Sequence, residues 1–219
     1  MSTSTAKDDR VPITPAIVVL ASQSPNRLKL LEQILPEKET TRLLQGIHNP
    51  VVRVSNFEEN LPKTLPVREF VEQTARGKLH AVLEDMKKNK ERYDVVIASD
   101  TVIYFEDEIV GKPANADDAF VTLQRLRGRE HLVYSGVALA YADGSEEVFS
   151  EETRVQFGDY PDRIIKQYVD SGEPLTRAGS YGIQEYGAVF VRGVHGCFSN
   201  VVGLPVHRVH SALVTKGIL

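Results

Sequence analysis

The sequence predicts an α/β protein with a mixed β-sheet flanked by helices. Two short apolar runs, at residues 16–21 and 95–97, have the length and composition of buried strands. After the first of them, apolar residues recur at helical spacing over 28–35. Further along, two β-like segments at 132–141 and 147–157 flank an Asp-Gly turn, which is typical of an antiparallel hairpin. A strand followed by a turn and a helix is typical of an α/β sheet, and the hairpin makes part of that sheet antiparallel. The sequence therefore predicts a mixed sheet.

Composition excludes a membrane-spanning protein and disfavours a nucleic-acid binder. The chain has 219 residues, of which 42% are hydrophobic and 26% are charged, as in ordinary globular domains. No apolar run approaches the roughly 20 residues that a membrane helix requires. The formal net charge of −4 disfavours general binding to nucleic acid, which usually needs an excess of Lys and Arg. A polyanionic ligand must therefore meet locally arranged positive charge.

The start of the chain and its cysteine content favour a cytoplasmic protein. The first residues are polar and lack the apolar core of a secretion signal, so we expect a disordered tail at 1–12 and a single domain at 13–219. Cys197 is the only cysteine, which rules out an internal disulfide and fits a reducing compartment.

The first predicted strand is followed directly by a turn and a helix. Ser24 fits the N-cap of this helix, Pro25 fits its first turn, and Pro36 ends the helical pattern. The free amide groups at such a helix start attract anions, and Arg27 would add a fork of donors for a phosphate. An ordinary capped helix with a surface arginine explains the same residues.

The next segments place two carboxylates and a lysine on a loop and a helix. A short strand is predicted at 51–54, and the loop after it carries Glu58 and Glu59. Paired carboxylates supply the oxygen ligands that Mg²⁺ prefers, although most exposed Glu pairs are simply solvated. A helix is predicted over 66–86, with Lys78 near its apolar face. Lys78 either extends its ammonium to solvent or points it into a cleft.

The second predicted strand leads into Ser99, Asp100 and Thr101. In open α/β sheets ligands bind beyond the carboxyl ends of the strands, so these side chains are expected where a polar ligand would be met. Asp100 either meets that ligand or only caps a turn or pairs with a nearby cation. Residues 102–104 are expected to continue as β structure.

A phosphate loop of the NTPase type is excluded after this strand. Gly111-Lys112-Pro113 has Glu106 where that loop needs a glycine, and Pro113 where it needs Ser or Thr. Lys112 either faces a phosphate as a point charge from a rigid turn or is a solvated surface lysine.

The last part of the chain adds helices and a glycine-rich loop. Helices are predicted at 117–126, at 164–169 and from residue 201 through 213. Residues 177–184 contain glycines that either let the backbone approach a ligand or form a plain turn, and their spacing is not a dinucleotide fingerprint. The paired histidines of the closing helix have no third ligand, so packing or surface roles are favoured over a metal site.

Taken together, residues 20–213 resemble the Maf family of nucleoside triphosphate pyrophosphatases. The resemblance rests on several ordered motifs: residues 20–27 (Leu-Ala-Ser-Gln-Ser-Pro-Asn-Arg), Glu58-Glu59, Ala75 with Lys78, residues 99–102 (Ser-Asp-Thr-Val), Gly111-Lys112-Pro113, Gly128-Arg129 with His131, residues 178–184 (Ala-Gly-Ser-Tyr-Gly-Ile-Gln) and residues 202–205 (Val-Gly-Leu-Pro).

The resemblance implies a fold and an activity. The fold would be an elongated mixed sheet flanked by helices, with two lobes around a central cleft. The activity would be cleavage of the α–β phosphoanhydride of a nucleoside triphosphate, giving a nucleoside monophosphate and pyrophosphate, as a house-cleaning function. It implies a divalent cation, Mg²⁺ or Mn²⁺, and a homodimer would be unsurprising.

The resemblance also assigns roles to residues. Asp100 would act on the attacking water, either as its general base or as the group that orients it. The remaining assignments are Lys78 and Lys112 in catalysis, Glu59, Glu58 and Asp100 at the metal, and Ser22, Arg27, Thr101, Gln184, Asn26 and Arg177 in substrate binding.

Two departures from the family pattern bear on the substrate. Asn26 stands where many members carry a second arginine, and Arg177 stands where lysine is common. Thr101 and Gln184 resemble the branch that acts on dTTP and UTP, which favours pyrimidine nucleotides, including CTP or modified forms. The alternatives are a 7-methyl-GTP pyrophosphatase and a non-catalytic nucleotide-binding regulator of cell division, which needs the cations but not the carboxylates.

Overall fold

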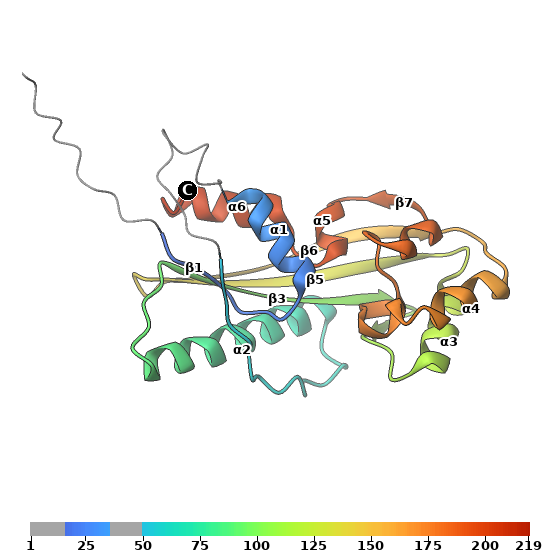
Figure 1. The fold of residues 1–219 in the computed structure, drawn as a ribbon, viewed down its shortest axis with the longest axis horizontal. Helices are drawn as coiled ribbons and strands as arrows, with labels where there is room; N and C mark the ends of the chain where they lie inside the picture. Colours follow the sequence, from blue (N-terminus) through green and yellow to red (C-terminus); the bar gives the residue numbers. More distant parts are fainter. Residues whose placement is uncertain (1–15, 36–49) are drawn as a thin grey trace, which may run out of the picture.

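The strand β3 (Val95–Phe105) runs along the molecule and pairs with three other strands of the sheet (Figure 1). The computed structural model describes residues 16–35 and 50–219, so the predicted tail at 1–12 lies outside the described residues. Within them is a seven-stranded sheet in the order β2-β1-β3-β5-β6-β7, with β4 paired to β3. The strands are β1 (Val18–Leu20), β2 (Val51–Val52), β3 (Val95–Phe105), β4 (Glu108–Val110), β5 (Glu130–Tyr141), β6 (Glu146–Phe157) and β7 (Val191–His195).

The sheet is mixed, which confirms the predicted fold class. β1 pairs in parallel with both β2 and β3, while β3, β5, β6 and β7 are antiparallel neighbours. The predicted hairpin joins β5 to β6. The sequence does not predict β7, because its five residues, Val-Arg-Gly-Val-His, combine a glycine with two polar side chains and show no clear alternation.

One edge of β3 has an uncovered stretch. On one side β5 pairs with β3 from residue 95 to residue 104. On the other side β1 pairs only with residues 95–97 and β4 only with residues 103–105. In the described chain no strand covers this edge between those two partners, because the chain leaves the sheet after β1 and enters a helix.

The position of Ser99, Asp100 and Thr101 differs from the prediction. They do not follow the end of a strand but lie in the middle of β3. The antiparallel partner β5 extends β3 well past them, and it is the neighbouring strand β1 that ends beside them. The polar residues therefore reach a ligand crevice through the uncovered edge of β3, at the carboxyl end of β1.

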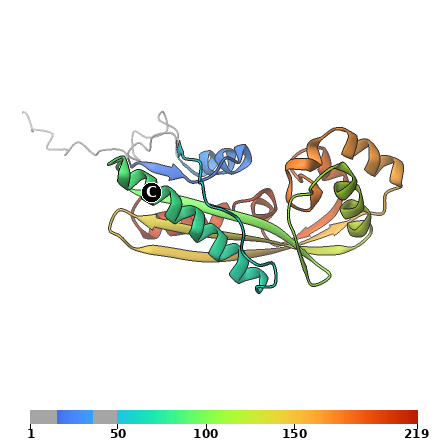
Figure 2. The ribbon, with the colours of Figure 1, turned by 90° about the horizontal axis from the view of Figure 1, so that it is seen from below.

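Strand alternation sends neighbouring residues of β3 to opposite faces. Ile97 packs with α1 (Pro25–Ile34) and α6 (Val206–Thr215), whereas Ala98 packs with α2 (Val67–Lys88). Figures 1 and 2 show α2 on the side of the sheet opposite α1 and α6. By the same alternation Asp100 faces α2 and Thr101 faces α1.

The sheet carries two lobes, each with its own hydrophobic core. The first is formed by α1, α2 and α6, and the second lies at the opposite end of the sheet. α3 (Ala116–Leu126) and α4 (Asp162–Asp170) pack there against β3, β5 and β6, as Figure 1 shows. Short 3₁₀ turns follow at Glu173–Thr176, Ala178–Ser180 and Tyr186–Phe190. The predicted helices at 28–35, 66–86, 117–126 and 164–169 are all confirmed within a few residues.

The closing helix differs from the prediction. Instead of one helix from residue 201, α5 (Phe198–Val202) and α6 are separated by a break at Gly203 and Pro205. Gly203 has a φ of +129°, a conformation that favours glycine, and Pro205 cannot continue a helix. After the break, the Gly203 carbonyl accepts hydrogen bonds from the Ser99 hydroxyl at 3.1 Å and from Arg27 Nε at 2.9 Å. None of the helices in residues 16–35 and 50–219 combines the length and the apolar character needed to cross a bilayer.

Candidate active site

A cavity of about 530 Å³ opens between the two lobes, beside the uncovered edge of β3. Its walls come from segments far apart in the sequence, including the start of α1, α2, β3, the turn after β4 and the 3₁₀ region. Most predicted site residues line it: Ser22, Asn26, Arg27, Glu59, Lys78, Thr101, Lys112, Arg177 and Gln184.

The start of α1 forms one part of the wall, and its predicted N-cap is confirmed. The Ser24 hydroxyl caps the helix by accepting the Arg27 amide at 3.4 Å, and Pro25 opens the first turn. The Ser22 hydroxyl oxygen accepts the Ser24 amide at 3.1 Å. A helix start carries partial positive charge, so this wall favours an anionic ligand.

Arg27 is fixed at three points of its guanidinium. Its Nε donates to the Gly203 carbonyl at 2.9 Å, Nη1 donates to Ser22 Oγ at 3.3 Å, and Nη2 donates to Thr101 Oγ1 at 3.0 Å. Burial lowers the pKa of Arg27, while the carboxylates of Asp100 and Glu59 oppose that shift. Arginine nevertheless stays charged at neutral pH, so the cavity contains a rigid buried cation.

Thr101 lies in the network that holds Arg27. Its hydroxyl is 2.8 Å from Ser135 Oγ, and Ser135 in turn donates to the Asn200 carbonyl at 3.2 Å. Asn200 is fully buried, with its amide nitrogen donating to the Val133 carbonyl at 3.1 Å. Sequence reasoning does not identify Ser135 or Asn200, because a small hydroxyl in a strand and one asparagine in a short helix carry no distinguishing pattern.

Lys78 joins two carboxylates from different segments. Its Nζ lies 2.7 Å from Asp100 Oδ1 and 2.9 Å from Glu59 Oε1, and its side chain is only 11% exposed. Asp100 is itself buried and does not line the cavity directly. Of the two alternatives for Lys78, the structure has the one in which the ammonium points into a cleft, and Asp100 pairs with it.

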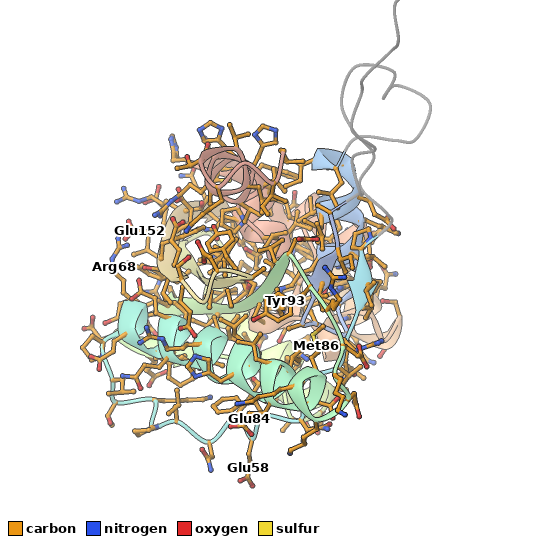
Figure 3. The ribbon with its side chains drawn as sticks, turned by 90° about the vertical axis from the view of Figure 1, so that its left-hand side faces the viewer. Glu58, Arg68, Glu84, Met86, Tyr93 and Glu152 are labelled. Atoms are coloured by element: carbon orange, nitrogen blue, oxygen red, sulfur yellow. The ribbon has the colours of Figure 1, made fainter. Side chains whose placement is uncertain are left out.

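A glycine explains why the Glu59 loop lies against α2. A Cβ at Gly77 would overlap the ring of Phe57, so the missing side chain lets Phe57 pack directly on the helix. Glu59 follows two residues later and reaches Lys78, the next residue after Gly77. Both glutamates are exposed, but Glu58 points away from the body of the protein, as Figure 3 shows, and forms no ion pair with Lys78 in the described part of the chain. The structure therefore does not bring Glu58 to the predicted metal ligands.

The carboxylate pair fits a divalent metal of the expected kind. Among the described residues, no group of three or more His, Cys, Asp or Glu side chains could hold a metal ion. Mg²⁺, however, is usually held by one or two carboxylates together with phosphate oxygens of the substrate. Asp100 and Glu59 meet at a single cation and offer such a pair of oxygen ligands.

The opposite wall is built by the turn after β4 and by residues 176–184. Lys112 is exposed and lines the cavity, and the Gly111 carbonyl accepts the Gly179 amide at 2.9 Å, which ties the two segments together. Arg177 forms an ion pair with Glu185 at 2.7 Å, while its Nε is buried and has no hydrogen-bond partner among residues 16–35 and 50–219. This wall therefore holds a buried donor that is available to a ligand.

Gly182 brings polar side-chain atoms close together on this wall. A Cβ at Gly182 would lie 3.2 Å from Gln184 Nε2, 3.2 Å from Glu173 Oε1 and 3.4 Å from Arg177 Nε. The Glu173 oxygen already accepts the Tyr168 hydroxyl and the Gly187 amide. Both nitrogens carry hydrogen-bond donors and lie near the same face of one glycine. Gly182 thus lets these two donors lie close together on the wall, where a side chain at position 182 would crowd them.

A buried His–Tyr pair supports the same wall. Tyr181 lines the cavity, and its hydroxyl is 2.8 Å from His131 Nε2 in β5. Phe157 packs edge-on against both rings, with ring centroids 5.0 and 4.8 Å away. Burial lowers the pKa of His131 to about 3, so this imidazole is neutral at physiological pH. The sequence motif contains His131, but no spacing in it indicates that Tyr181 is its partner.

Comparison with known proteins gives one consistent result. Residues 17–216 match the family model described as Maf-like protein. The dTTP/UTP pyrophosphatase of Clostridium tetani is 34% identical over 91% of this chain and 97% of its own length. That of Nitratidesulfovibrio vulgaris is 38% identical over 92% of this chain and 89% of its own. The solved Ham1 protein of Staphylococcus aureus shares the fold with a TM-score of 0.50, at 13% identity over 91% of this chain and 98% of that one.

Proposed function

This chain belongs to the Maf family, and from that premise we propose that it hydrolyses nucleoside triphosphates to a nucleoside monophosphate and pyrophosphate. The curated relatives described above are named dTTP/UTP pyrophosphatases and cover nearly the whole chain, which favours a pyrimidine nucleotide as the substrate. The proposal includes a divalent cation, Mg²⁺ or Mn²⁺, as a requirement and the cytoplasm as the location. A homodimer stays an expectation of the family resemblance.

The observation that carries the proposal is the meeting of three cations and two carboxylates at one cavity. Arg27, Lys78 and Lys112 come from a helix start, a helix and a turn, and all line the same space. Glu59 and Asp100 both form ion pairs with Lys78. A protein with a net charge of −4 gathers positive charge in this way where it must bind a polyanion.

Phosphoryl transfer of this kind needs positioning and charge rather than a covalent intermediate. Arg27 is held rigid by three hydrogen bonds, so it binds phosphate oxygens without losing side-chain freedom at that moment. Lys112 approaches from the other lobe and neutralises charge that grows on the departing pyrophosphate. The two lobes thereby hold the triphosphate from both sides.

Asp100 is the carboxylate assigned to the attacking water. It lies next to the cations that hold the phosphates, and it accepts a hydrogen bond from the water and orients it toward the α-phosphorus. A divalent metal held by Asp100 and Glu59 would supply charge neutralisation and lower the pKa of bound water. Glu58 is not given a role in this proposal, because its side chain points away from the body of the protein.

The second wall is assigned to the nucleobase. Arg177 Nε and Gln184 Nε2 are donors near Gly182, and the carbonyl oxygens of uracil and thymine are acceptors. Cytosine carries an amino group in place of one of those carbonyls. The donor pair therefore favours dTTP and UTP over CTP. Asn26 is buried in the lining on the other side, where its amide takes less space than a second arginine.

Incubation of the purified protein with a panel of triphosphates tests this function. The panel contains dTTP, UTP, CTP, GTP and 7-methyl-GTP with Mg²⁺ or Mn²⁺, and chromatography identifies the products. We expect monophosphate and pyrophosphate in equal amounts, fastest from dTTP and UTP, and none with EDTA. Diphosphate and orthophosphate as products would contradict cleavage between the α- and β-phosphates.

Two other outcomes identify the rival functions. Faster turnover of 7-methyl-GTP than of dTTP and UTP would identify the chain as a 7-methyl-GTP pyrophosphatase. Tight binding of a triphosphate without turnover under either metal would indicate a nucleotide-binding regulator. Both outcomes are distinguished by running calorimetric binding and product analysis on the same preparation. The carboxylate pair at Lys78 argues for the enzyme, because a regulator needs only the cations.

A further inference from the structure

Lys78 occupies the place where two carboxylates converge. Its ammonium is within 2.9 Å of an oxygen of Asp100 and an oxygen of Glu59, and the Lys78 and Asp100 side chains are about one-tenth exposed. The three groups come from α2, β3 and the loop before α2, so the contact is a product of the fold and not of helical spacing. The Glu59 side chain is 58% exposed, so it is the buried Asp100 carboxylate that needs a cation beside it, and Glu59 adds a second carboxylate to the same ammonium.

A divalent ion and the Lys78 ammonium compete for the same oxygens. Asp100 Oδ1 and Glu59 Oε1 are the atoms that already bond to Nζ, and the cations repel each other at short range. A metal that used both oxygens would therefore have to displace the ammonium. Arg27 is the other cation on this wall, while Lys112 and Arg177 bring positive charge to the opposite wall of the cavity.

The chemistry of lysine suits such an exchange. An ammonium is a compact point charge on a flexible four-carbon stem, whereas a guanidinium is a rigid planar fork. Arg27 is held by three hydrogen bonds, whereas among the described residues the Lys78 ammonium contacts only the two carboxylates, and Lys78 already lines the cavity. Its head can swing from the carboxylates to a phosphate without any change in the backbone of α2.

We propose that Lys78 is the resident counter-ion of the metal site, so that the metal binds together with the nucleotide and not before it. In the free protein the ammonium holds Asp100 and Glu59 together. When a metal–triphosphate complex enters, the phosphates attract the ammonium and the two carboxylates pass to the metal. This inference rests on the proposed function where it names a nucleotide as the ligand. The competition between Lys78 and the metal is independent of that function.

Binding of Mn²⁺ in the absence of nucleotide tests the competition. Electron paramagnetic resonance measures free Mn²⁺ in titrations of wild type, Lys78→Met and Lys112→Met. We expect Lys78→Met to bind Mn²⁺ about tenfold more tightly than wild type, because the internal competitor is gone. Lys112→Met removes one positive charge from the same cavity without touching the carboxylates, so its affinity for Mn²⁺ should stay within about twofold of wild type. Equal affinities of wild type and Lys78→Met would overturn the proposal.

Two further variants separate site competition from general charge effects. Lys78→Arg keeps a cation at the carboxylates and should bind Mn²⁺ as weakly as wild type. Adding Glu59→Gln to Lys78→Met should remove most of the gain, because one of the two ligands is lost. Equal tightening in Lys78→Met and Lys112→Met would attribute the effect to overall charge and would overturn the assignment to Lys78.

The wild-type protein provides a test that does not depend on the folding of a variant. We expect stoichiometric Mn²⁺ binding only when the non-hydrolysable analogue α,β-imido-dUTP is present. Tight Mn²⁺ binding by the wild-type protein alone would overturn the proposed order. Failure of the proposed function has a different signature: no triphosphate is turned over, while Lys78→Met still gains affinity for Mn²⁺.

Discussion

The two walls of the cavity are built on different principles. The N-terminal wall is formed by Ser22, Arg27, Glu59 and Lys78. Its two cations come from the helices α1 and α2 and are held by hydrogen bonds and ion pairs. The C-terminal wall, formed by Lys112 and residues 176–184, consists of short 3₁₀ turns with left-handed residues. Buried polar atoms without partners, including Arg177 Nε and Ser180 Oγ, lie in this second wall.

The difference indicates a division of labour. The N-terminal wall has its charges in position before a ligand arrives, which suits phosphate binding and catalysis. The C-terminal wall keeps donors unused and relies on backbone shape, which suits recognition of an uncharged base. Substitutions in the first wall should therefore reduce the rate of the reaction, and those in the second should change stability or substrate affinity.

The largest effect is expected from Asp100→Asn in the N-terminal wall. The amide keeps the size of the side chain but removes the negative charge that orients water and holds the metal, so kcat should fall by a factor on the order of 10³. Pyrophosphate release from dTTP measures the rate. Asp107→Asn makes the same change at an exposed position of the β3–β4 turn and should leave kcat unchanged. Full activity of Asp100→Asn would remove Asp100 from the mechanism.

The next effect concerns the shape of the C-terminal wall. Gly179 has a φ of +65°, and a Cβ there would overlap the side chain of Ile103. Gly179→Ala should lower the free energy of unfolding by about 3 kcal/mol, through backbone strain and overpacking together. Gly172→Ala is the matched control, because Gly172 has a φ of +78° but nothing within 4 Å of its Cβ position. Urea unfolding should give a smaller loss of about 1 kcal/mol for that variant.

The third prediction concerns the His131–Tyr181 support of the same wall. The pKa of His131 is lowered from 6.5 to about 3 by burial, so between these values the unfolded chain binds a proton that the folded protein does not. Stability from this group is therefore fully present above pH 6.5 and is lost as the pH falls toward 3. Between pH 6.5 and pH 5.0 the loss should be about 2 kcal/mol.

A variant isolates this titration from the carboxylates that titrate nearby. His131→Gln keeps a hydrogen-bonding partner for Tyr181 but carries no titrating group. Urea unfolding of both proteins at pH 7.5 and pH 5.0 should give a smaller loss of stability for the variant. Equal losses in wild type and His131→Gln would show that His131 does not control the acid sensitivity of the fold.

The sequence predicts the N-terminal wall better than the C-terminal one for a physical reason. Ser24 and Pro25 mark a helix start by local rules, and Asp100 is found because it follows a run of buried β-branched residues. Glu59 and Lys78 are found as residues, but their contact depends on Phe57 packing against Gly77, which no local pattern contains.

The C-terminal wall depends on long-range contacts throughout. The sequence identifies residues 177–184 as a glycine-rich loop but does not indicate that Gly179 bonds to the Gly111 carbonyl or that Tyr181 meets His131. The same limit explains the error at Ser99, Asp100 and Thr101. The sequence shows where an apolar run ends, but the length of β3 is set by its antiparallel pairing with β5, which lies some thirty residues away.

The smallest expected effect comes from the conservative change Arg177→Lys, which restores the residue common in the family. Arg177 pairs with Glu185 at 2.7 Å, and Glu185 is 41% exposed, so loss of this ion pair alone should cost little. The change also removes Nε–H, the buried donor beside Gln184. Because that donor is assigned to the base and not to the phosphates, KM for dTTP should rise by about threefold while kcat stays constant.

Glu185→Gln is the control that weakens the ion pair but keeps Nε–H, and its KM should stay near that of wild type. A fall in kcat with constant KM in Arg177→Lys would mean that Arg177 stabilises the transition state, and the division between the two walls would then fail at this residue.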